Sequence, residues 1–349
     1  MKNNKNYLKV FIVIFIIIII IASITYVRIS NIQNINQSTA SFKSSLYNTN
    51  YNKIWVASFQ LAWNELINKL GGKVEFENNL DIANELNQQV ITKDMIDSQS
   101  YYIKVENNYS GLEEEIEQDL KLKFDIDTTN ILENDIQSGD YIIFAMLNTS
   151  FEFKEPFPEV ENNKFGGSNN FVKYFGVNPQ TKESTANQIT ILFYNNQDDF
   201  AIKISTKGND ELVLYKNKDI DNFYNAYSKI NQESISYTRE KNINPKKDNV
   251  RIPFINFKTT INYDELCNKK IKGLDNGIGK AMQNVEFKLD NYGGNIFSEA
   301  VIETYESMST ETSERELNFN DRFFLFIKEK GQDIPYFALL VDNDDVLVK

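Results

Sequence analysis

The sequence FFLFI at residues 323–327 and the sequence YFALLV at residues 336–341 are strongly apolar runs close to the end of the chain. Residues 328–335, which are mainly polar, separate them. Short continuous apolar runs bounded by turn residues are typical of fully buried strands. We therefore predict that the two segments form a hairpin and that this hairpin belongs to the core.

Further strands are predicted upstream of this hairpin. Residues 141–148 (YIIFAMLN) are almost continuously apolar, as expected for a strand that is covered on both faces. Residues 188–194 and 200–205 flank the polar sequence NNQDD and predict a second hairpin. Other strands are expected at residues 120–126, 250–261, 285–289 and 296–305.

Helix signals are fewer. Apolar residues recur every three or four positions over residues 55–70, and Gly71 and Gly72 follow, which predicts a helix that ends there. The same spacing predicts a second helix that contains Leu112, Ile116 and Leu120. No internal repeat is visible. The pattern predicts one domain of the α+β class.

The 349-residue chain contains no histidine and a single cysteine, Cys267. Without histidine, Ser-His-Asp and Cys-His catalysis and His-ligated metal sites are excluded. A single cysteine excludes intramolecular disulfides and multi-cysteine metal sites, and we interpret it as a packed side chain. Carboxylate, Ser-Lys or hard-metal chemistry remains, or no catalysis, and we expect no enzymatic activity and no cofactor.

The charge is distributed unevenly along the chain. The net charge is −12, but residues 1–28 carry four basic side chains and no acidic one, so the remainder carries a net charge of −16. Nucleic-acid binding depends on Lys and Arg side chains that neutralise phosphates. We therefore expect no nucleic-acid partner, and the acidity is sufficiently explained by solubility.

Residues 10–27 (VFIVIFIIIIIIASITYV) contain no charged side chain. At 1.5 Å per residue, such a helix is about 27 Å long, which is close to the hydrocarbon thickness of a bilayer. Lysines precede the segment, so residues 1–9 are predicted to stay in the cytoplasm and the rest to cross. A cleaved signal peptide is the alternative, but its apolar region is normally shorter and ends in a small-x-small site.

These features predict four regions. Residues 1–9 form a cytoplasmic tail, residues 10–27 a single transmembrane signal anchor, residues 28–50 a polar stalk, and residues 51–349 the extracytoplasmic domain. The predicted location is the cell membrane, with the C-terminal domain outside the cytoplasm.

Three further motifs do not predict a specific activity. Residues 273–281 (GLDNGIGKA) lack the glycine spacing and the Ser or Thr of a phosphate-binding loop, and we interpret them as a plain loop. Residues 342–345 (DNDD) lack the EF-hand pattern, so specific calcium binding has little support. The glutamates of residues 113–117 lie on one helical turn, which is typical of a solvated face. A carboxylate-dependent enzyme on an unrelated α+β fold stays open as a third hypothesis.

Residues 306–318 (ESMSTETSERELN) are almost devoid of apolar side chains, although they lie between a predicted strand and the apolar hairpin. A segment of this kind is typical of an exposed loop that proteases cleave easily. Its length and position indicate a functional loop as readily as a plain connection.

The order of the segments resembles the serpin family over roughly residues 52–345. An exposed loop ahead of a C-terminal apolar hairpin is the first point of resemblance. The matching segments are FNDRFFLFI at 319–327, YFALLV at 336–341, LDNYG at 289–293, IPFINF at 252–257, YIIFAML at 141–147, EPF at 155–157 after Phe153, and the helix at 55–70, which resembles the family's first helix. The resemblance implies a serpin-like domain with a large central β-sheet, smaller sheets and several helices.

The resemblance also implies a reactive loop at about residues 294–318. Its hinge would contain Gly293, Gly294, Ser298, Glu299 and Ala300, and the bond attacked by a protease would lie near Met308 and Ser309.

An inhibitory serpin inserts this cleaved loop into its central sheet as a new strand. By strand alternation Phe297 and Glu299 share one face, and a buried unpaired carboxylate would oppose insertion by several kcal/mol. The acidic pair expected before the hinge glycine is replaced by Asn291 and Tyr292.

Two functions of different classes follow from the resemblance. The first is a membrane-tethered serine-protease inhibitor that acts through the reactive loop. The second is a non-inhibitory serpin-like binding module outside the cytoplasm. The predicted partners are the membrane, through residues 10–27, and a serine protease or another extracytoplasmic protein.

Overall fold

The computed structural model describes residues 37–38, 42–43, 46, 51–132, 136–137, 139–295 and 314–349. These residues form three β-sheets and five α-helices, which confirms the α+β class. The helices are α2 (Ser58–Leu70), α3 (Asp81–Leu86), α4 (Leu112–Phe124), α5 (Glu183–Ala186) and α6 (Phe223–Ser236). The short 3-10 helices are η1 (Lys93–Met95), η2 (Ser98–Ser100), η3 (Asp264–Leu266) and η4 (Asp344–Val346).

The first sheet, which we call the hairpin sheet, contains the two apolar runs from which the prediction began. Its strands, in spatial order, are β1 (Gln37–Ser38), β2 (Lys53–Val56), β18 (Phe337–Val341), β17 (Phe323–Glu329), β10 (Asp210–Lys216), β9 (Asp199–Ser205) and β8 (Ile189–Asn196). Strands β17 and β18 pair antiparallel, and all five residues of β18 are buried. The predicted C-terminal hairpin is therefore confirmed, as is the hairpin of β8 and β9.

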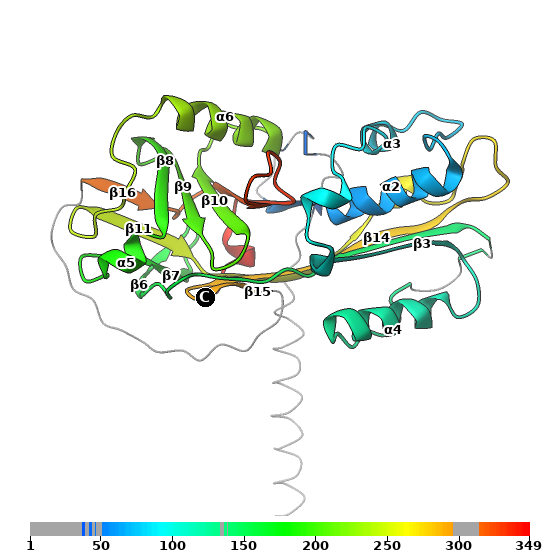
Figure 1. Ribbon diagram of the computed structural model, residues 1–349, viewed down its shortest axis with the longest axis horizontal. Helices are drawn as coiled ribbons and strands as arrows, with labels where there is room; N and C mark the ends of the chain where they lie inside the picture. Colours follow the sequence, from blue (N-terminus) through cyan, green and yellow to red (C-terminus); the bar gives the residue numbers. More distant parts are fainter. Residues whose placement is uncertain are drawn as a thin grey trace, which may run out of the picture.

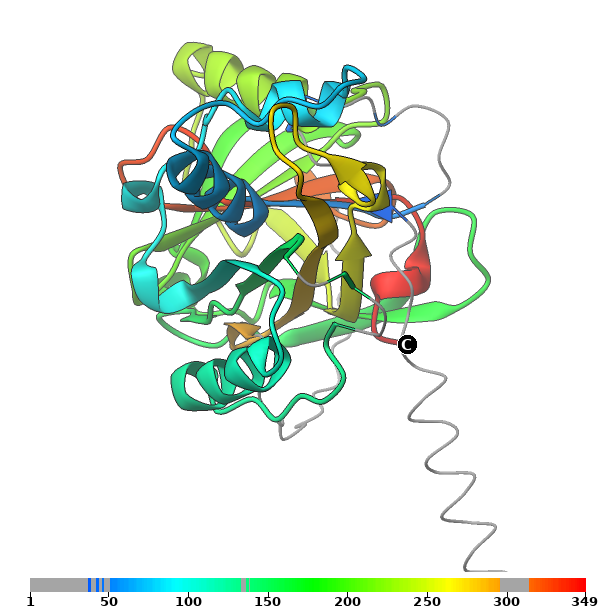
Figure 2. The same ribbon diagram turned by 90° about the vertical axis from the view of Figure 1, so that its right-hand side faces the viewer.

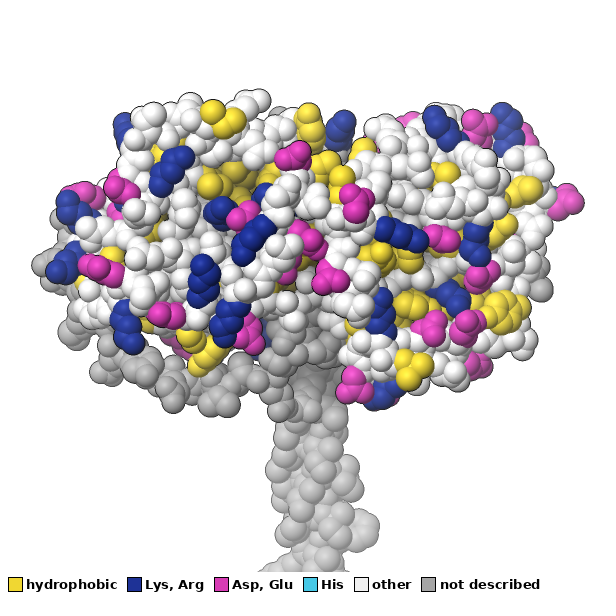
Figure 3. Space-filling model, in the orientation of Figure 1, with side chains coloured by type: hydrophobic (Ala, Val, Ile, Leu, Met, Phe, Trp, Pro, Cys, Tyr) yellow, Lys and Arg dark blue, Asp and Glu magenta, His cyan; other side chains and the backbone are white. Residues whose placement is uncertain are grey.

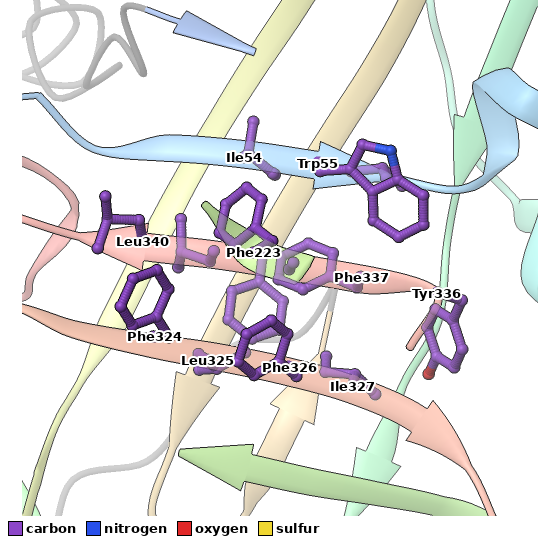
Figure 4. Close-up of a cluster of buried hydrophobic side chains, with 14 of the residues drawn as sticks. Ile54, Trp55, Phe223, Phe324, Leu325, Phe326, Ile327, Tyr336, Phe337 and Leu340 are labelled. Atoms are coloured by element: carbon purple, nitrogen blue, oxygen red, sulfur yellow. The ribbon is translucent and has the colours of Figure 1, made fainter. Parts of the chain in front are cut away.

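Aromatic side chains fill the space between the hairpin sheet and α6. Phe326 of β17 lies 5.2 Å from Tyr227 and 6.2 Å from Phe223, measured between ring centroids, and both partners belong to α6. Figure 4 shows Phe223 against the side chains of β17 and β18, with Ile54 and Trp55 on β2, the strand on the other side of β18. Large aromatic rings bury much apolar area, so this cluster contributes strongly to the stability of the fold.

The second sheet has four strands in the order β16 (Arg315–Asn318), β11 (Asp248–Pro253), β7 (Phe171–Val177) and β6 (Glu159–Lys164). The predicted strand at residues 250–261 is in fact two strands. The chain leaves the second sheet after Pro253 and enters the third sheet at Ile255 as β12 (Ile255–Asn262). Proline lacks a backbone donor, so it is suited to the end of a strand.

The third sheet, which we call the central sheet, runs across the middle of the molecule between α2 and α4 (Figures 1 and 2). Its spatial order is β3 (Tyr101–Asn107), β4 (Tyr141–Leu147), β14 (Gly277–Asp290), β15 (Gly293–Asn295) and β5 (Phe151–Glu152). Strand β12 and the short β13 (Lys269–Lys270) also pair with β14. Six of the seven residues of β4 are buried, which confirms a strand covered on both faces.

Two predictions about the central sheet and the helix that covers it were wrong. Residues 120–124 belong to α4 and not to a strand, and Leu122 is 85% exposed on the outer face of this helix. Residues 277–281, interpreted as part of a loop, begin β14. The glycines of this segment allow close backbone contact, since a Cβ on Gly277 would overlap the carbonyl oxygen of Lys269 in β13.

Candidate functional site

The central sheet contains a fork, which is the feature that the predicted hinge residues occupy. Strands β4 and β14 are parallel and pair directly, from Ile278 opposite Tyr141 to Val285 opposite Leu147. Four residues after this last pair, Leu289 of β14 and Phe151, the first residue of β5, do not pair with each other.

Strand β15 fills the space where these two strands separate. Gly294 lies opposite Leu289 of β14 and opposite Phe151 of β5, and β15 is antiparallel to both. Adjacent strands are about 4.8 Å apart, so the strands of β14 and β5 are separated by roughly twice that spacing. At the fork, the chain that follows β14 therefore returns as the short strand β15 between β14 and β5.

The two glycines at the start of β15 are required by this geometry. Gly293 has φ = 148°, and a Cβ on it would overlap the carbonyl oxygen of Phe151. A Cβ on Gly294 would overlap the aromatic ring of the same phenylalanine. Only glycine lets the backbone approach β5 this closely, which explains the two consecutive glycines at the start of β15.

A buried polar network lies behind the seam, the directly paired part of β4 and β14. Gln283 of β14 is completely buried, and its Nε2 donates to Oγ of Ser58, the first residue of α2, at 2.6 Å. The hydroxyl of Tyr263 donates to Oε1 of Gln283 at 3.0 Å, and burial raises the pKa of this tyrosine. Buried polar groups need such partners, so the network positions α2 on the core face of β14.

Helix α4 covers the outer face of the seam. Its Leu112, Ile116 and Leu120 form a separate buried cluster with Phe144 of β4 and Met282 of β14, so the helix contacts both sides of the seam. This cluster is smaller than the main core, to which its residues do not belong.

Polar contacts attach the same helix to the edge strand β3. Nζ of Lys104 lies 2.6 Å from Oε1 of Glu115, and the hydroxyl of Tyr102 donates to Asp119 at 2.8 Å. The hydrogen bond from Lys104 lowers the pKa of Glu115. Helix α4 is thus held by apolar contacts across the seam and by polar contacts beside it.

A partly buried carboxylate, that of Asp210, lies where the hairpin sheet meets the central sheet. The hydroxyl of Tyr336, which is 2% exposed, donates to Oδ1 of Asp210 at 2.7 Å. Burial raises the pKa of Asp210, and the nearby carboxylates of Glu329 and Asp97 act in the same direction. Tyr336 also interacts with Thr149, which lies between β4 and β5 at the fork.

The predicted reactive-loop residues divide into two groups. Gly293 and Gly294 lie in β15 at the fork. Ser298, Glu299, Ala300, Met308 and Ser309 lie outside the described residues, as does the anchor predicted at residues 10–27.

Some residues of the fork were missed by the sequence analysis. They include Phe151 and Glu152, because β5 is only two residues long and has no recognisable pattern. Gln283 was missed as well, because a polar residue within a strand does not reveal its buried partners.

The acidic segment at residues 342–345 is engaged in structural contacts. Oδ1 of Asp342 lies 3.1 Å from Nη1 of Arg322, and Oδ2 of Asp344 lies 3.2 Å from Nζ of Lys349. Asp344 also accepts a hydrogen bond from Ser168 at 2.8 Å. Among the described residues, no group of three or more acidic or cysteine side chains is arranged to hold a metal ion.

A helix that crosses a membrane must be long and apolar. Within the part of the chain that the structure describes, no helix is both long and apolar enough to do so. The anchor at residues 10–27 therefore stays a prediction from the sequence.

Comparison with known proteins gives a fold but no close relative. Neither the protein-family models nor the curated protein sequences contain a significant match to this chain. Solved structures do match. A serpin from Schistosoma mansoni is 13% identical, with a TM-score of 0.52, and the alignment covers 83% of this chain and 95% of that one.

Two human proteins match similarly. Glycosylated kallistatin is 10% identical with a TM-score of 0.52, and the alignment covers 84% of this chain and 92% of that one. Thyroxine-binding globulin, in complex with its hormone, is 10% identical with a TM-score of 0.51, covering 86% of this chain and 94% of that one.

Three sheets, a parallel seam and a strand entering it define a class of mixed α+β protein with a large central sheet. The structural matches specify this class further: the chain has a serpin-like fold. At 10–13% identity, this similarity concerns the fold alone. The resemblance noted in the sequence is thereby confirmed at the level of architecture.

Proposed function

We propose that this protein is a membrane-tethered serpin-like inhibitor of a serine protease, which acts by inserting its reactive loop into the central sheet. The observation that supports the proposal most directly is the fork. Strand β15 already pairs with β14 on one side and with β5 on the other. A strand that continued beyond Asn295 in the same direction would enter between β14 and β4.

The register of β15 predicts which side chains would enter the core. If that register continued, Ser298 would lie between Val285 and Leu147, and Ala300 would lie between Gln283 and Ala145. Val285 and Gln283 are buried on the core face of β14. Small side chains at these two positions are compatible with a tightly packed layer.

The same register bears on the cost of inserting Glu299, which the sequence analysis expected to oppose insertion. Phe297 and Glu299 would lie opposite Glu286 and Asn284, on the outer face of β14. Those two residues are partly exposed, unlike the buried residues on the core face. A carboxylate at position 299 would therefore avoid the main core. Its other neighbour in this register, Met146 of β4, is buried in the small cluster under α4, so its cost of desolvation would be reduced only in part.

The cleavage site and the membrane anchor complete the proposal. A protease would cleave near Met308 and Ser309, fifteen residues after Gly293 in the sequence. Residues 10–27 would hold the domain at the outer surface of the cell membrane as a single span. Protection of the domain from added protease in sealed, right-side-out cells would contradict this location.

The inhibitor proposal is tested by incubating the purified full-length chain with a panel of serine proteases. We expect a protease–inhibitor adduct that survives denaturing electrophoresis, and a higher melting temperature of the cleaved chain. Cleavage near Met308 without an adduct and without stabilisation would contradict the proposal.

Two variants test the register. Ala300→Arg places a charge on the predicted core face, and we expect it to abolish the adduct while cleavage continues. Glu299→Arg is the matched control on the predicted outer face, and we expect it to retain the adduct. The opposite result would show that the loop does not enter in the register of β15.

A second candidate function is a binding module for a small aromatic ligand, and a cavity favours it. The cavity has a volume of about 310 Å³ and lies between α6, β2 and the chain after α3. Its apolar lining residues are Phe42, Trp55, Val90, Tyr224, Tyr227 and Ile334. Figure 3 shows hydrophobic side chains exposed in the groove between the parts that carry α6 and α3. Thyroxine-binding globulin, which shares the fold, binds a small aromatic hormone.

The ligand-binding candidate is tested with 8-anilinonaphthalene-1-sulfonate, an aromatic anion whose fluorescence rises in apolar sites. We expect saturable binding that Tyr224→Ala weakens about tenfold, since an aromatic wall is lost. Ile235→Ala removes an 85% exposed side chain of the same helix and is the control, with no expected effect. Equal binding by both variants would exclude this cavity.

A further inference from the structure

A second cavity, which is polar, lies between the hairpin sheet and the second sheet. Its volume is about 540 Å³. Walls come from the end of β6, the turn between β8 and β9, the end of β10, β16 and the chain after β16. The cavity is separate from the fork, and the proposed inhibition makes no use of it.

Lys216, at the end of β10, is the least exposed charged residue that lines this cavity. It is 4% exposed, and its Nζ donates to Oδ1 of Asn320 at 2.8 Å. The nearest carboxylate oxygen belongs to Asp198 and is 3.6 Å away, which is too long for a hydrogen bond. An ammonium group has three donors, so this buried cation has hydrogen-bonding capacity left. Burial lowers the pKa of Lys216, and the carboxylates of Asp198 and Asp321 oppose this shift.

The other carboxylates in the lining are already engaged. Oδ2 of Asp321 lies 2.5 Å from Nζ of Lys218. Oε2 of Glu316 accepts hydrogen bonds from the amides of Asn249 and Asn318. These acids are therefore neutralised or satisfied by residues other than Lys216.

The lining of the cavity contains further polar groups that a ligand could contact, namely the Lys164 ammonium group and the side-chain oxygen of Asn318. Lys164 lines the cavity and has no ion pair with any residue that the structure describes. Oδ1 of Asn318 is buried and lacks a hydrogen-bond partner in the same described part. A buried carbonyl oxygen without a partner is unfavourable, and a hydroxyl group can satisfy it.

We propose that this polar cavity binds a small hydroxycarboxylate anion. Carboxylate oxygens of the ligand accept hydrogen bonds from Lys216 and Lys164, and a hydroxyl group of the ligand donates to Oδ1 of Asn318. The ligand bridges β10, β6 and β16, and it uses hydrogen-bonding capacity of Lys216 that Asn320 leaves free. Binding therefore stabilises the attachment of β16 to the rest of the fold.

The test is calorimetric titration of the full-length chain with citrate, a hydroxytricarboxylate. We expect one site per chain. Lys164→Met, which changes an exposed side chain, should weaken binding about tenfold or more, since a charge-assisted hydrogen bond is lost. Lys216→Met should abolish binding. The control is Lys207→Met, which removes the same charge from an exposed pair with Glu152, and it should bind like the wild type.

Propane-1,2,3-tricarboxylate, which lacks only the hydroxyl group of citrate, tests the role of Asn318. We expect it to bind more weakly than citrate to the wild type and equally to Asn318→Ala. Equal affinity of the wild type for both anions would overturn the role of the hydroxyl group. Unchanged citrate affinity in Lys164→Met, or no citrate binding by the wild type, would overturn the site. Neither outcome affects the proposed inhibition, which is measured with proteases.

Discussion

The hairpin sheet and the seam of the central sheet are both buried, but they are held in different ways. Strands β17 and β18 pair antiparallel, and aromatic rings of α6 and β2 pack against them within the main core. Strands β4 and β14 pair in parallel, and their outer face is covered by α4 through a small separate cluster. Parallel pairing is slightly less stable per residue, so the seam is the weaker contact.

This comparison has a functional meaning. The strands of the hairpin sheet pair without a gap, whereas the central sheet is forked beyond the seam, where β15 lies between β14 and β5. A fold that contains both can keep its core while a strand is added at the seam. The following predictions test that contrast, from the largest expected effect to the smallest.

A disulfide across the seam should abolish inhibition. Asn284 and Met146 are register partners in β14 and β4, and a cysteine at each position can form a bond without large backbone movement. We expect the oxidised Asn284→Cys/Met146→Cys variant to fold and to form no protease adduct, with recovery on reduction.

The control for this crosslink uses the other neighbour of β14. Thr260 of β12 is the register partner of Asn284 on that side, where no strand has to enter. The oxidised Asn284→Cys/Thr260→Cys variant should form the adduct normally. Equal inhibition by both crosslinked proteins would contradict opening at the seam.

Removing an aromatic ring from the hairpin sheet should destabilise the whole fold. Phe326 is completely buried, and Phe326→Ala should lower the free energy of unfolding by about 3–5 kcal/mol. Urea denaturation measures the effect. Phe171→Ala removes a ring that is 61% exposed and should change stability by less than about 0.5 kcal/mol.

The partly buried carboxylate of Asp210, beside the fork, should make stability depend on pH. The pKa of Asp210 is raised in the folded state, so the folded chain holds this proton more tightly than the unfolded chain. Its contribution is therefore favourable below the unfolded pKa and is lost as the pH rises through the folded pKa.

Asp210→Asn keeps an acceptor for Tyr336 and removes the titration. We expect the unfolding free energy of this variant, taken relative to that of the wild type at the same pH, to increase between pH 4 and pH 7. A parallel pH dependence of the two proteins would show that Asp210 titrates normally.

The smallest effect on global stability is expected from the polar contacts between β3 and α4. Lys104→Met removes the contacts with Glu115 and Asp119, which are partly exposed, so global stability should fall by only about 1 kcal/mol or less. Amide hydrogen exchange in α4 should become faster, while exchange in β17 should not change. Lys121→Met, in an exposed pair on the same helix, is the control and should leave exchange in α4 unchanged.

The wrong predictions share a physical cause. Leu120, Leu122 and Phe124 alternate with charged residues as in a strand, but Leu120 also continues the helical spacing of Leu112 and Ile116. Both periods fit a short segment. Leu120 packs with Leu112 and Ile116 in the cluster between α4 and the central sheet, so the segment is helical and Leu122 is exposed. Pro253 is a local signal that a strand can end within residues 250–261, but nothing local reveals which strands the two halves pair with.

The sequence by itself determined the features that depend on local composition and period. These are the apolar hairpin at residues 323–341, the buried strand β4, the helix that ends before Gly71, and the absence of histidine chemistry. Such features follow from which side chains can be buried and which backbone conformations glycine permits. The hinge role of Gly293 and Gly294 is implied only by the family resemblance, and it stays a prediction.

The tertiary structure alone decided the register. Only the pairing of β15 with both β14 and β5 assigns Ser298 and Ala300 to the core side of a continued strand and Glu299 to the outer side. Alternation in the sequence gives two faces but does not say which one is buried, because that depends on partners more than a hundred residues away. The polar cavity around Lys216 arises in the same way, from the meeting of two sheets.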